Sequence, residues 1–173
     1  MTEGSGHQEL IKGAEGDLRT WMDGPSNPGL TVLSSHGGSE GKPNLYSKVT
    51  DSPHRENWLS DPDLVLVGTS EAGKKEVRLV VEVKAKDVRP KDIAGIIAIT
   101  SMARYLRSRR TSAVLNGCPL FILIDSKVLG TKESPKRKQL DMIVRLLRIP
   151  DGTVTTVVIC SEEEFGNSLR DHM

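Results

Sequence analysis

Two stretches of the chain that are rich in Val and Leu contain charged residues at positions where a buried strand would be apolar: Asp63 in DPDLVLVG, and Glu82 and Lys84 in VVEVKAK. Buried strands usually avoid charges, because taking a charge out of water costs free energy unless a partner neutralises it. The two carboxylates and the backbone carbonyl of Val83 are the hard oxygen ligands that Mg²⁺ or Mn²⁺ prefers. An ion of this kind lowers the pKa of a water molecule, and Lys84 is suited to holding that water beside a phosphate. These residue types therefore favour metal-assisted hydrolysis of a phosphodiester.

A β-hairpin would bring these three groups together. The polar segment TSEAGKKE contains a glycine, separates the two apolar stretches and is typical of a turn. If Gly68 and Val77 are the last residues paired before this turn, Asp63 lies directly across from Glu82. Lys84 then lies on the same face as Glu82, because side chains alternate along a strand. Two carboxylates opposed on neighbouring strands repel each other, so this arrangement predicts a neutralising divalent cation.

The remaining sequence predicts alternating helices and strands, recognised by helical spacing of apolar residues and by short apolar runs. In chain order we expect a helix at residues 7–22, a short strand at 30–33, hairpin strands at 63–68 and 77–84, a helix from Pro90 into the arginine-rich segment near residue 110, a buried central strand at 120–125, a helix at 136–149, a strand at 154–160 and a short helix capped by Ser161. This order predicts a single α/β domain over residues 1–173, with a mixed central β-sheet flanked by helices. Because 15 of the 30 residues from 24 to 53 are Gly, Ser or Pro, we expect that segment to be flexible.

Charge is distributed unevenly along the chain. The net charge of the whole chain is +1, but residues 84–148 contain 15 Lys and Arg against 5 Asp and Glu. A basic segment of this kind suits binding to a polyanion, and the aromatic content of 3% favours phosphate contacts over base stacking. Candidate contacts to nucleic acid are Arg104, Arg107, Lys136, Arg137 and Lys138, although cations at a helix end are also common on a solvated surface.

Membrane insertion and secretion are not indicated. The sequence contains no run of 18 apolar residues and no signal peptide, so we expect an intracellular protein. Cys118 and Cys160 lie far apart at strand-like positions without metal-binding spacing, which indicates buried free thiols.

The spacing of the charged residues resembles that of the PD-(D/E)XK nuclease superfamily. Pro62-Asp63 is followed after 18 residues by Glu82-Val83-Lys84, and the predicted order of elements is similar to the αβββαβ core of restriction endonucleases. The resemblance implies that Asp63 and Glu82 bind the metal and that Lys84 positions the nucleophile. It implies an endonuclease that cuts DNA with Mg²⁺ or Mn²⁺, and it leaves open a homodimer that would cut both strands.

Many members of the superfamily add a metal-binding glutamate from the first helix. Glu15 in KGAEGDL is the first candidate for this ligand, Glu9 is the second and Glu56 in HRENW is the third. RecB-like members also have a glutamine followed four residues later by a tyrosine, on the helix after the core motif. Tyr105 in SMARY matches the tyrosine and is therefore a candidate contact to nucleic acid, but Ser101 stands where the glutamine would be.

Three other interpretations remain open. Asp63 could begin its strand in a turn, while Glu82 and Lys84 alternate on a solvated edge strand. The chain could be an RNA endonuclease of the viral cap-snatching type, which shares the fold and often has a metal-binding histidine; His36 or His54 would then be that ligand. It could also be a nuclease-like module that binds nucleic acid without cleaving it.

Overall fold

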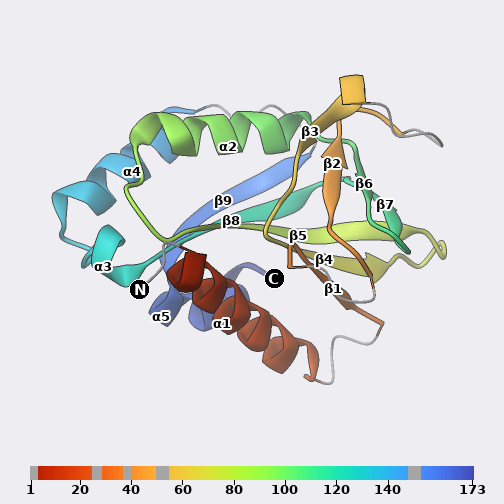
Figure 1. Cartoon of the computed structure of the whole chain (residues 1–173), viewed down its shortest axis with the longest axis horizontal. Coiled ribbons are helices and arrows are strands. Elements are labelled where there is room, and N and C mark those ends of the chain that lie inside the picture. The colour runs from red at the N-terminus through yellow and green to blue at the C-terminus, as the bar shows by residue number, and fades with distance from the viewer. Residues whose placement is uncertain (1–3, 25–28, 37–39, 50–54, 148–152) are drawn as a thin grey trace.

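The computed structural model describes residues 4–24, 29–36, 40–49, 55–147 and 153–173, and these form one mixed β-sheet between two layers of helices (Figure 1). The helices are α1 (Gly4–Met22), α2 (Pro90–Met102), α3 (Ser126–Leu129), α4 (Pro135–Leu146) and α5 (Glu162–His172), with a 3-10 helix, η1, at Arg55–Asn57. None of the helices in these ranges combines the length and the hydropathy that crossing a lipid bilayer requires. The strands are β1 (Thr31–Ser34), β2 (Asn44–Tyr46), β3 (Trp58–Ser60), β4 (Leu64–Thr69), β5 (Lys75–Lys84), β6 (Tyr105–Arg107), β7 (Ser112–Val114), β8 (Cys118–Ile124) and β9 (Val154–Ser161). The predicted class, an α/β fold with a mixed sheet flanked by helices, is confirmed.

Strand β5 organises the sheet. It pairs antiparallel with β4 on one side and parallel with β8 on the other, and β1 and β9 continue the sheet outward from β4 and β8. Near its start β5 also pairs with β7, which leads through β6 and β2 to β3. The parallel strands β5, β8 and β9 end at the same edge of the sheet, where Lys84, Ile124 and Ser161 lie in register. The first turns of α1 lie at this edge (Figure 1).

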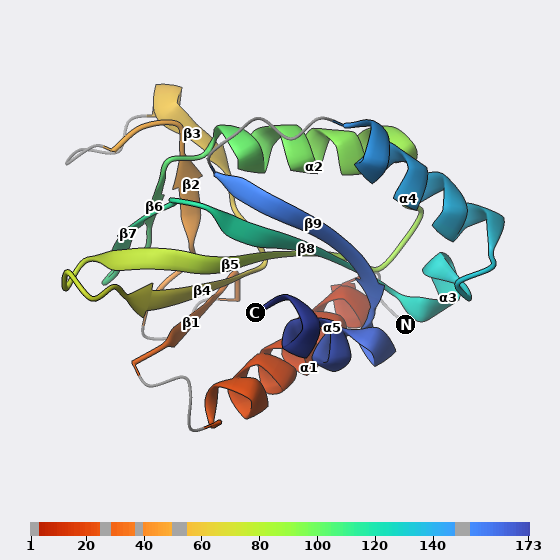
Figure 2. The same ribbon diagram turned by 180° about the vertical axis from the view of Figure 1, so that it is seen from behind.

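Two hydrophobic cores cover the two faces of the sheet. The core beneath α2 and α4 includes Val80 and Ile122, and the core against α1 and α5 includes Val81 and Phe121. Figure 2 shows these two helix layers on opposite sides of the strands. Successive residues of β5 and β8 thus alternate between two buried environments, which explains why β8 is apolar almost throughout. The prediction of a central strand covered on both faces is confirmed.

A β-bulge changes the register of the β4–β5 hairpin. Near the turn Gly68 pairs with Glu76, and not with Val77 as we assumed from the sequence. The register then shifts by one, because β5 has an additional residue, Arg78, that has no partner in β4. The part of the hairpin beyond the bulge therefore has a different register from the part next to the turn.

The largest difference from the predicted elements is at the end of α2. We expected this helix to continue into the arginine-rich segment, but it ends at Met102, and the extended backbone of Ala103 (φ −69°, ψ 141°) leads into β6. Strand β6 then pairs with both β2 and β7. The described part of segment 24–53 also contains two strands, of which β2 was not predicted. Strands of three residues are too short to show a periodic pattern, so their pairing partners decide whether they form.

Cys118 and Cys160 are buried free thiols, as predicted. Burial raises the pKa of each thiol to about 12. Both side chains are therefore protonated at neutral pH and serve as small apolar residues of the core.

Candidate active site

The hairpin brings two carboxylates together at the carboxyl end of β5. Beyond the bulge Leu64 pairs with Val81, so the next residue outward, Asp63, lies across from Glu82 as the sequence predicts. Both acidic residues are buried, each with 8% of its surface exposed. In open α/β sheets, ligand sites lie at this edge, beyond the carboxyl ends of the parallel strands.

Donors from two neighbouring strands fix the carboxylate of Asp63. The N–H of Val83 donates a hydrogen bond of 2.8 Å to Oδ2, and Oγ of Ser35 donates one of 3.4 Å to Oδ1. The N–H of Ser35 also donates to the backbone carbonyl of Asp63 at 2.8 Å. The end of β1, the start of β4 and the end of β5 are joined through this one residue, so its side chain has a defined position.

Burial changes the acidity of Glu82. Desolvation raises the pKa of Glu82 to about 7, the nearby ammonium of Lys84 opposes this shift, and repulsion by Asp63 and Asp61 adds to it. Nζ of Lys84 lies 3.4 Å from Oε2 of Glu82. Glu82 therefore keeps its proton to a higher pH than an exposed glutamate does, and a cation that binds here competes with that proton.

The interpretation of these residues as solvated charges on an edge strand is wrong. Strand β5 is an interior strand, paired with β4 on one side and with β7 and β8 on the other. Glu82 is buried, and only 33% of the Lys84 side chain is exposed. Protection of an exposed strand edge against aggregation therefore does not explain these charges.

A residue that was not predicted, His7 of α1, also reaches the site. Its Nε2 lies 3.1 Å from the carbonyl oxygen of Val83 and 3.6 Å from Oδ2 of Asp63. Because both neighbours are acceptors, Nε2 carries the proton that it donates to them. Imidazole is a common metal ligand, so His7 is a candidate ligand once that proton leaves. Its helical spacing matches that of Ile11 and Ala14, which face the core, and this spacing is the signal that could have found it.

The residues at this edge fit a hard cation bound mainly through oxygen. Asp63, Glu82 and the carbonyl of Val83 supply oxygen ligands, and Mg²⁺ is commonly held by one or two carboxylates, with water and phosphate oxygens completing its coordination. Within the described ranges, no group of three or more His, Cys, Asp and Glu side chains is arranged to hold a metal ion. The fit is therefore to a two-carboxylate site that water and substrate complete, and not to a site closed by protein ligands.

Comparisons with known proteins do not assign a family. No protein-family model, no curated protein and no solved structure matches this chain. The function is therefore inferred from the residues of the site.

Glu15, the first candidate for a metal ligand from α1, does not reach the site. Its carboxylate accepts a hydrogen bond from Arg19 at 2.6 Å. Glu15 also follows His7 by eight residues, which is about 12 Å along a helix. Because α1 begins at the site and runs away from it, a ligand has to come from its first turns. Glu9 is nearer, but it is exposed and lines a separate cavity of about 400 Å³ together with Asp125.

The remaining candidate ligands lie elsewhere. Glu56 is exposed in η1. His36 is an exposed residue beyond the end of β1, where the neighbouring Ser35, and not His36, contacts Asp63. His54 lies outside the described residues.

Arg104 holds the end of α2 in place, although it was predicted to contact nucleic acid. Its guanidinium donates to the carbonyl of Ser101 at 2.9 Å and to the carbonyl of Ala103 at 3.0 Å. It also donates to Oγ1 of Thr153. Tyr105 and Arg107 lie in β6 and not on a helix. The segment from Ser101 to Tyr105 therefore does not form the helical element of RecB-like nucleases.

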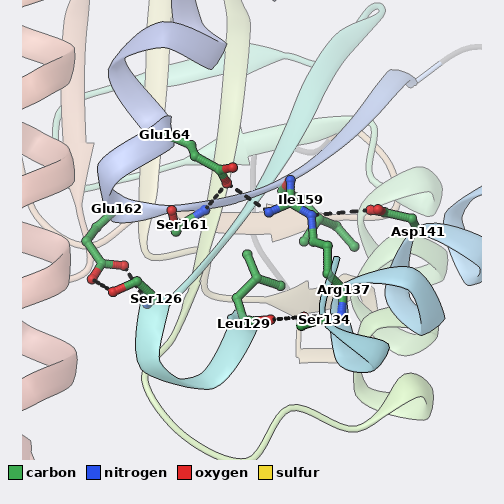
Figure 3. A network of polar contacts seen from close by, with 9 residues as sticks. All are labelled: Ser126, Leu129, Ser134, Arg137, Asp141, Ile159, Ser161, Glu162 and Glu164. Carbon is green, nitrogen blue, oxygen red and sulfur yellow. Dashed lines mark hydrogen bonds and ion pairs between the residues drawn. The ribbon is translucent and has the colours of Figure 1, made fainter. Parts of the chain in front are cut away.

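Arg137 was also predicted to contact nucleic acid, but it belongs to a polar network between α4, β9 and α5 (Figure 3). Only 13% of its side chain is exposed, and it donates to Glu164 at 2.8 Å and to the carbonyl of Ile159 at 2.9 Å. Asp141 lies 3.6 Å away, and the N–H of Ser161 donates to the same oxygen of Glu164 at 3.0 Å. Arg137 is therefore a structural residue, and the sequence interpretation is corrected.

The two lysines next to Arg137 have different surroundings. Lys138 is 61% exposed and forms an ion pair of 2.6 Å with Glu133, and Lys136 is partly exposed. Exposed ion pairs contribute little to stability, so these side chains can exchange one anionic partner for another. Both lysines stay candidates for phosphate contacts.

Proposed function

We propose that this protein is a divalent-metal-dependent endonuclease that hydrolyses phosphodiester bonds in DNA. The observation that carries the proposal is the pair of buried carboxylates, Asp63 and Glu82, on adjacent strands beside Lys84. Burying two acids together is costly unless a cation neutralises them, so their burial supports a metal site. The oxygen ligands favour Mg²⁺ or Mn²⁺.

The order of the central elements supports a restriction-endonuclease-like core. Along the chain α1, β1, β4, β5, α2 and β8 follow the αβββαβ order of the PD-(D/E)XK superfamily, with β2, β3, β6 and β7 as additions. In the sheet, β1, β4, β5 and β8 are consecutive neighbours. The two inner strands of this set are β4 and β5. Glu82 lies in β5, and Asp63 directly precedes β4.

Each residue of the site has a role in this proposal. Asp63, Glu82 and the carbonyl of Val83 would hold the metal ion, with His7 as a further candidate ligand. The ion supplies Lewis-acid chemistry, because it polarises a phosphate and lowers the pKa of a water molecule. Lys84 would hold the attacking water and stabilise the negative charge that develops on the phosphate.

Binding of the nucleic acid should depend mainly on its phosphates. Residues 84–148 are strongly basic, and the chain has few aromatic residues for stacking. Affinity should therefore fall steeply as salt rises, because each phosphate contact releases counterions. A homodimer would allow both strands of a duplex to be cut, and Lys136 and Lys138 are the candidate phosphate contacts on α4.

His7 favours a second candidate function, an RNA endonuclease of the cap-snatching type. That function calls for a histidine beside the metal-binding carboxylates. His7 meets this condition through its contacts with Asp63 and Val83, whereas the sequence pointed to His36 or His54. Faster cleavage of RNA than of DNA, with Mn²⁺ preferred and with activity lost in His7→Ala, would favour this candidate.

The test is a cleavage assay with labelled single-stranded, duplex and branched DNA and with RNA, in Mg²⁺, Mn²⁺ and EDTA. We expect the wild type to cut DNA in Mg²⁺ and not in EDTA, and Lys84→Ala to be slower by about 100-fold or more. Lys74→Ala removes an exposed lysine from the turn between β4 and β5 and is the matched control, which should cut like the wild type.

Two outcomes would contradict the proposal. Cleavage by Lys84→Ala at the wild-type rate would remove Lys84 from the mechanism. Calorimetry that detects no Mg²⁺ binding, with no change on Asp63→Ala, would leave only a module that binds nucleic acid without cutting it.

A further inference from the structure

A groove runs from the candidate site along α2. It has a volume of about 570 Å³ and is lined by Lys84, by the loop that follows β5 and by one side of α2. Lys84 belongs both to this groove and to the candidate site. A ligand in the groove would therefore be continuous with a phosphate held beside Lys84, and the volume is in the range typical of small-molecule sites.

The end of the groove next to the site is rich in cations. Lys84, Lys86 and Lys91 line it, together with Asp87 and Asp92. Asp92 accepts hydrogen bonds from the backbone and the guanidinium of an arginine at the start of α2, so its charge is already neutralised. Lys84 is likewise paired with Glu82, so Lys86 and Lys91, set against Asp87, carry the excess of positive charge at this end, which suits an anionic group such as a phosphate.

The other end of the groove is apolar. Ile96 and Ile99 line it, and Met102 lies one turn further along α2. Ile99 is 38% exposed and Met102 is 57% exposed. Ile93 and Ile97 supply the buried stripe of α2, so the core does not need the exposed side chains. Exposed apolar residues beside a charged site are typical of a ligand-binding surface.

Gly95 lines the groove between these two ends. A glycine inside a helix costs up to about 1 kcal/mol relative to alanine. Packing within the chain does not require it, because a Cβ atom added at Gly95 would meet no other atom within 4 Å. The absence of a side chain at Gly95 leaves this part of the groove open to a ligand.

We propose that this groove binds an unpaired nucleotide segment, with its phosphates at the lysines and with base and sugar against Gly95, Ile96 and Ile99. An unpaired base exposes apolar faces that can pack against the apolar end of the groove. A duplex stacks its bases inside and presents charged phosphates, and the apolar end offers no partner for these phosphates. The substrate is therefore single-stranded nucleic acid, or a single-stranded end of a duplex. This inference rests on the proposed function only for the position of the cleaved phosphate beside Lys84.

The test is a binding measurement in EDTA, which prevents metal-dependent cleavage. Fluorescence anisotropy of a labelled single-stranded oligonucleotide should show binding that is about tenfold or more tighter than that of a blunt duplex of the same sequence. Gly95→Leu fills the groove and should weaken single-strand binding by a similar factor, with little effect on the duplex. Gly16→Leu, at an exposed glycine of α1 that likewise has open space, is the matched control and should bind like the wild type.

Two further readouts make the test specific. Leucine favours a helix over glycine, so Gly95→Leu should melt no lower than the wild type, which separates groove filling from misfolding. Lys91→Ala should reduce the slope of log affinity against log salt by about 0.7 for the single strand.

Failure of the groove and failure of the nuclease are distinguishable. The proposal that the groove binds single strands would be overturned if Gly95→Leu bound the single strand as tightly as the wild type does, even if DNA is cut. It would also be overturned if the wild type bound the duplex and the single strand with equal affinity. Groove-dependent binding without any cleavage in Mg²⁺ or Mn²⁺ would support the groove and overturn the nuclease.

Discussion

The backbone N–H of Val83 donates a hydrogen bond of 2.8 Å to Oδ2 of Asp63. This bond lies beyond the last backbone pair of β4 and β5, Leu64 with Val81, so a carboxylate oxygen takes the place that a strand carbonyl would have. Asp63 is therefore both a structural partner of β5 and a candidate metal ligand. Substitutions at this position should affect stability and activity through different atoms.

Asp63→Ala should destabilise the metal-free protein by about 1–3 kcal/mol, because the buried N–H of Val83 loses its acceptor. Asp63→Asn keeps an acceptor oxygen and should lose less stability, although it also removes the charge. Both variants should lose metal-dependent cleavage. Urea unfolding in EDTA measures the first effect, and equal stability of the two variants would contradict the structural role of the carboxylate.

Glu82 should make the stability of the metal-free protein depend on pH between about 4.5 and 7. In most of this range the folded protein holds a proton on Glu82, whereas the unfolded chain has released it, so the free energy of unfolding falls as the pH rises. The contribution is complete below about pH 4.5 and is lost as the pH rises through about 7. It is on the order of a few kcal/mol, since a tenfold change in proton affinity corresponds to about 1.4 kcal/mol.

Glu82→Gln is the control for this pH dependence, because it is uncharged at every pH. Urea unfolding of both proteins in EDTA, on either side of this range, should show a flatter profile for the variant. Parallel profiles would mean that another group causes the pH dependence.

His7→Ala should weaken Mn²⁺ binding by about tenfold or more, whether His7 binds the metal directly or orients Asp63 and Val83. His36→Ala removes an exposed histidine and should bind Mn²⁺ like the wild type. Calorimetric titration of both variants at one pH is the measurement. If His7→Ala keeps the wild-type affinity, the contact with Val83 serves only to fix the start of α1.

Arg137→Ala should lower the free energy of unfolding by about 2–4 kcal/mol, near the low end for breaking a buried ion pair, because Glu164 is partly exposed. Lys136→Ala, one residue earlier, should change it by no more than about 0.5 kcal/mol. Arg137→Lys should not restore stability, since one ammonium does not reproduce the forked contacts with Glu164 and Ile159. Thermal unfolding tests all three, and a neutral Arg137→Ala would show that the network is dispensable.

The elements that the sequence predicts well are those with long patterns or strong end signals. Strand β8 has a continuous apolar run, α2 begins at Pro90, and α5 begins after Ser161, which forms a capping box with Glu164. The end of α2 and the three-residue strands have no such signal. Strand β6 pairs with β2, which is distant in sequence, so local propensity could not predict these strands.

The candidate site shows the same division between local and distant information. Asp63 and Glu82 could be placed together because alternation along two adjacent strands is a local rule. The spacing of His7 with Ile11 and Ala14 indicates only that His7 shares their face of α1, whereas its contact with Asp63 depends on how α1 packs across the sheet. Arg137 appeared to be a surface cation for a related reason: its partner, Glu164, comes from α5 and lies 27 residues away in the sequence.

Arg78, which no residue of β4 pairs with, lies at the bulge that sets the register of the residues following it in β5. With the pairing found at the turn continued unbroken, Asp63 would sit opposite Val81, and the two acids would belong to opposite sides of the sheet. The bulge that leaves Arg78 out of the pairing, remote from the acids themselves, thus determines whether they meet. Excising Arg78 would remove the bulge and leave Asp63 opposite Glu82, because the pairs on either side of it would then follow one another directly. Inserting one further residue in this part of β5, without a second bulge, would instead move the two acids to opposite faces of the sheet.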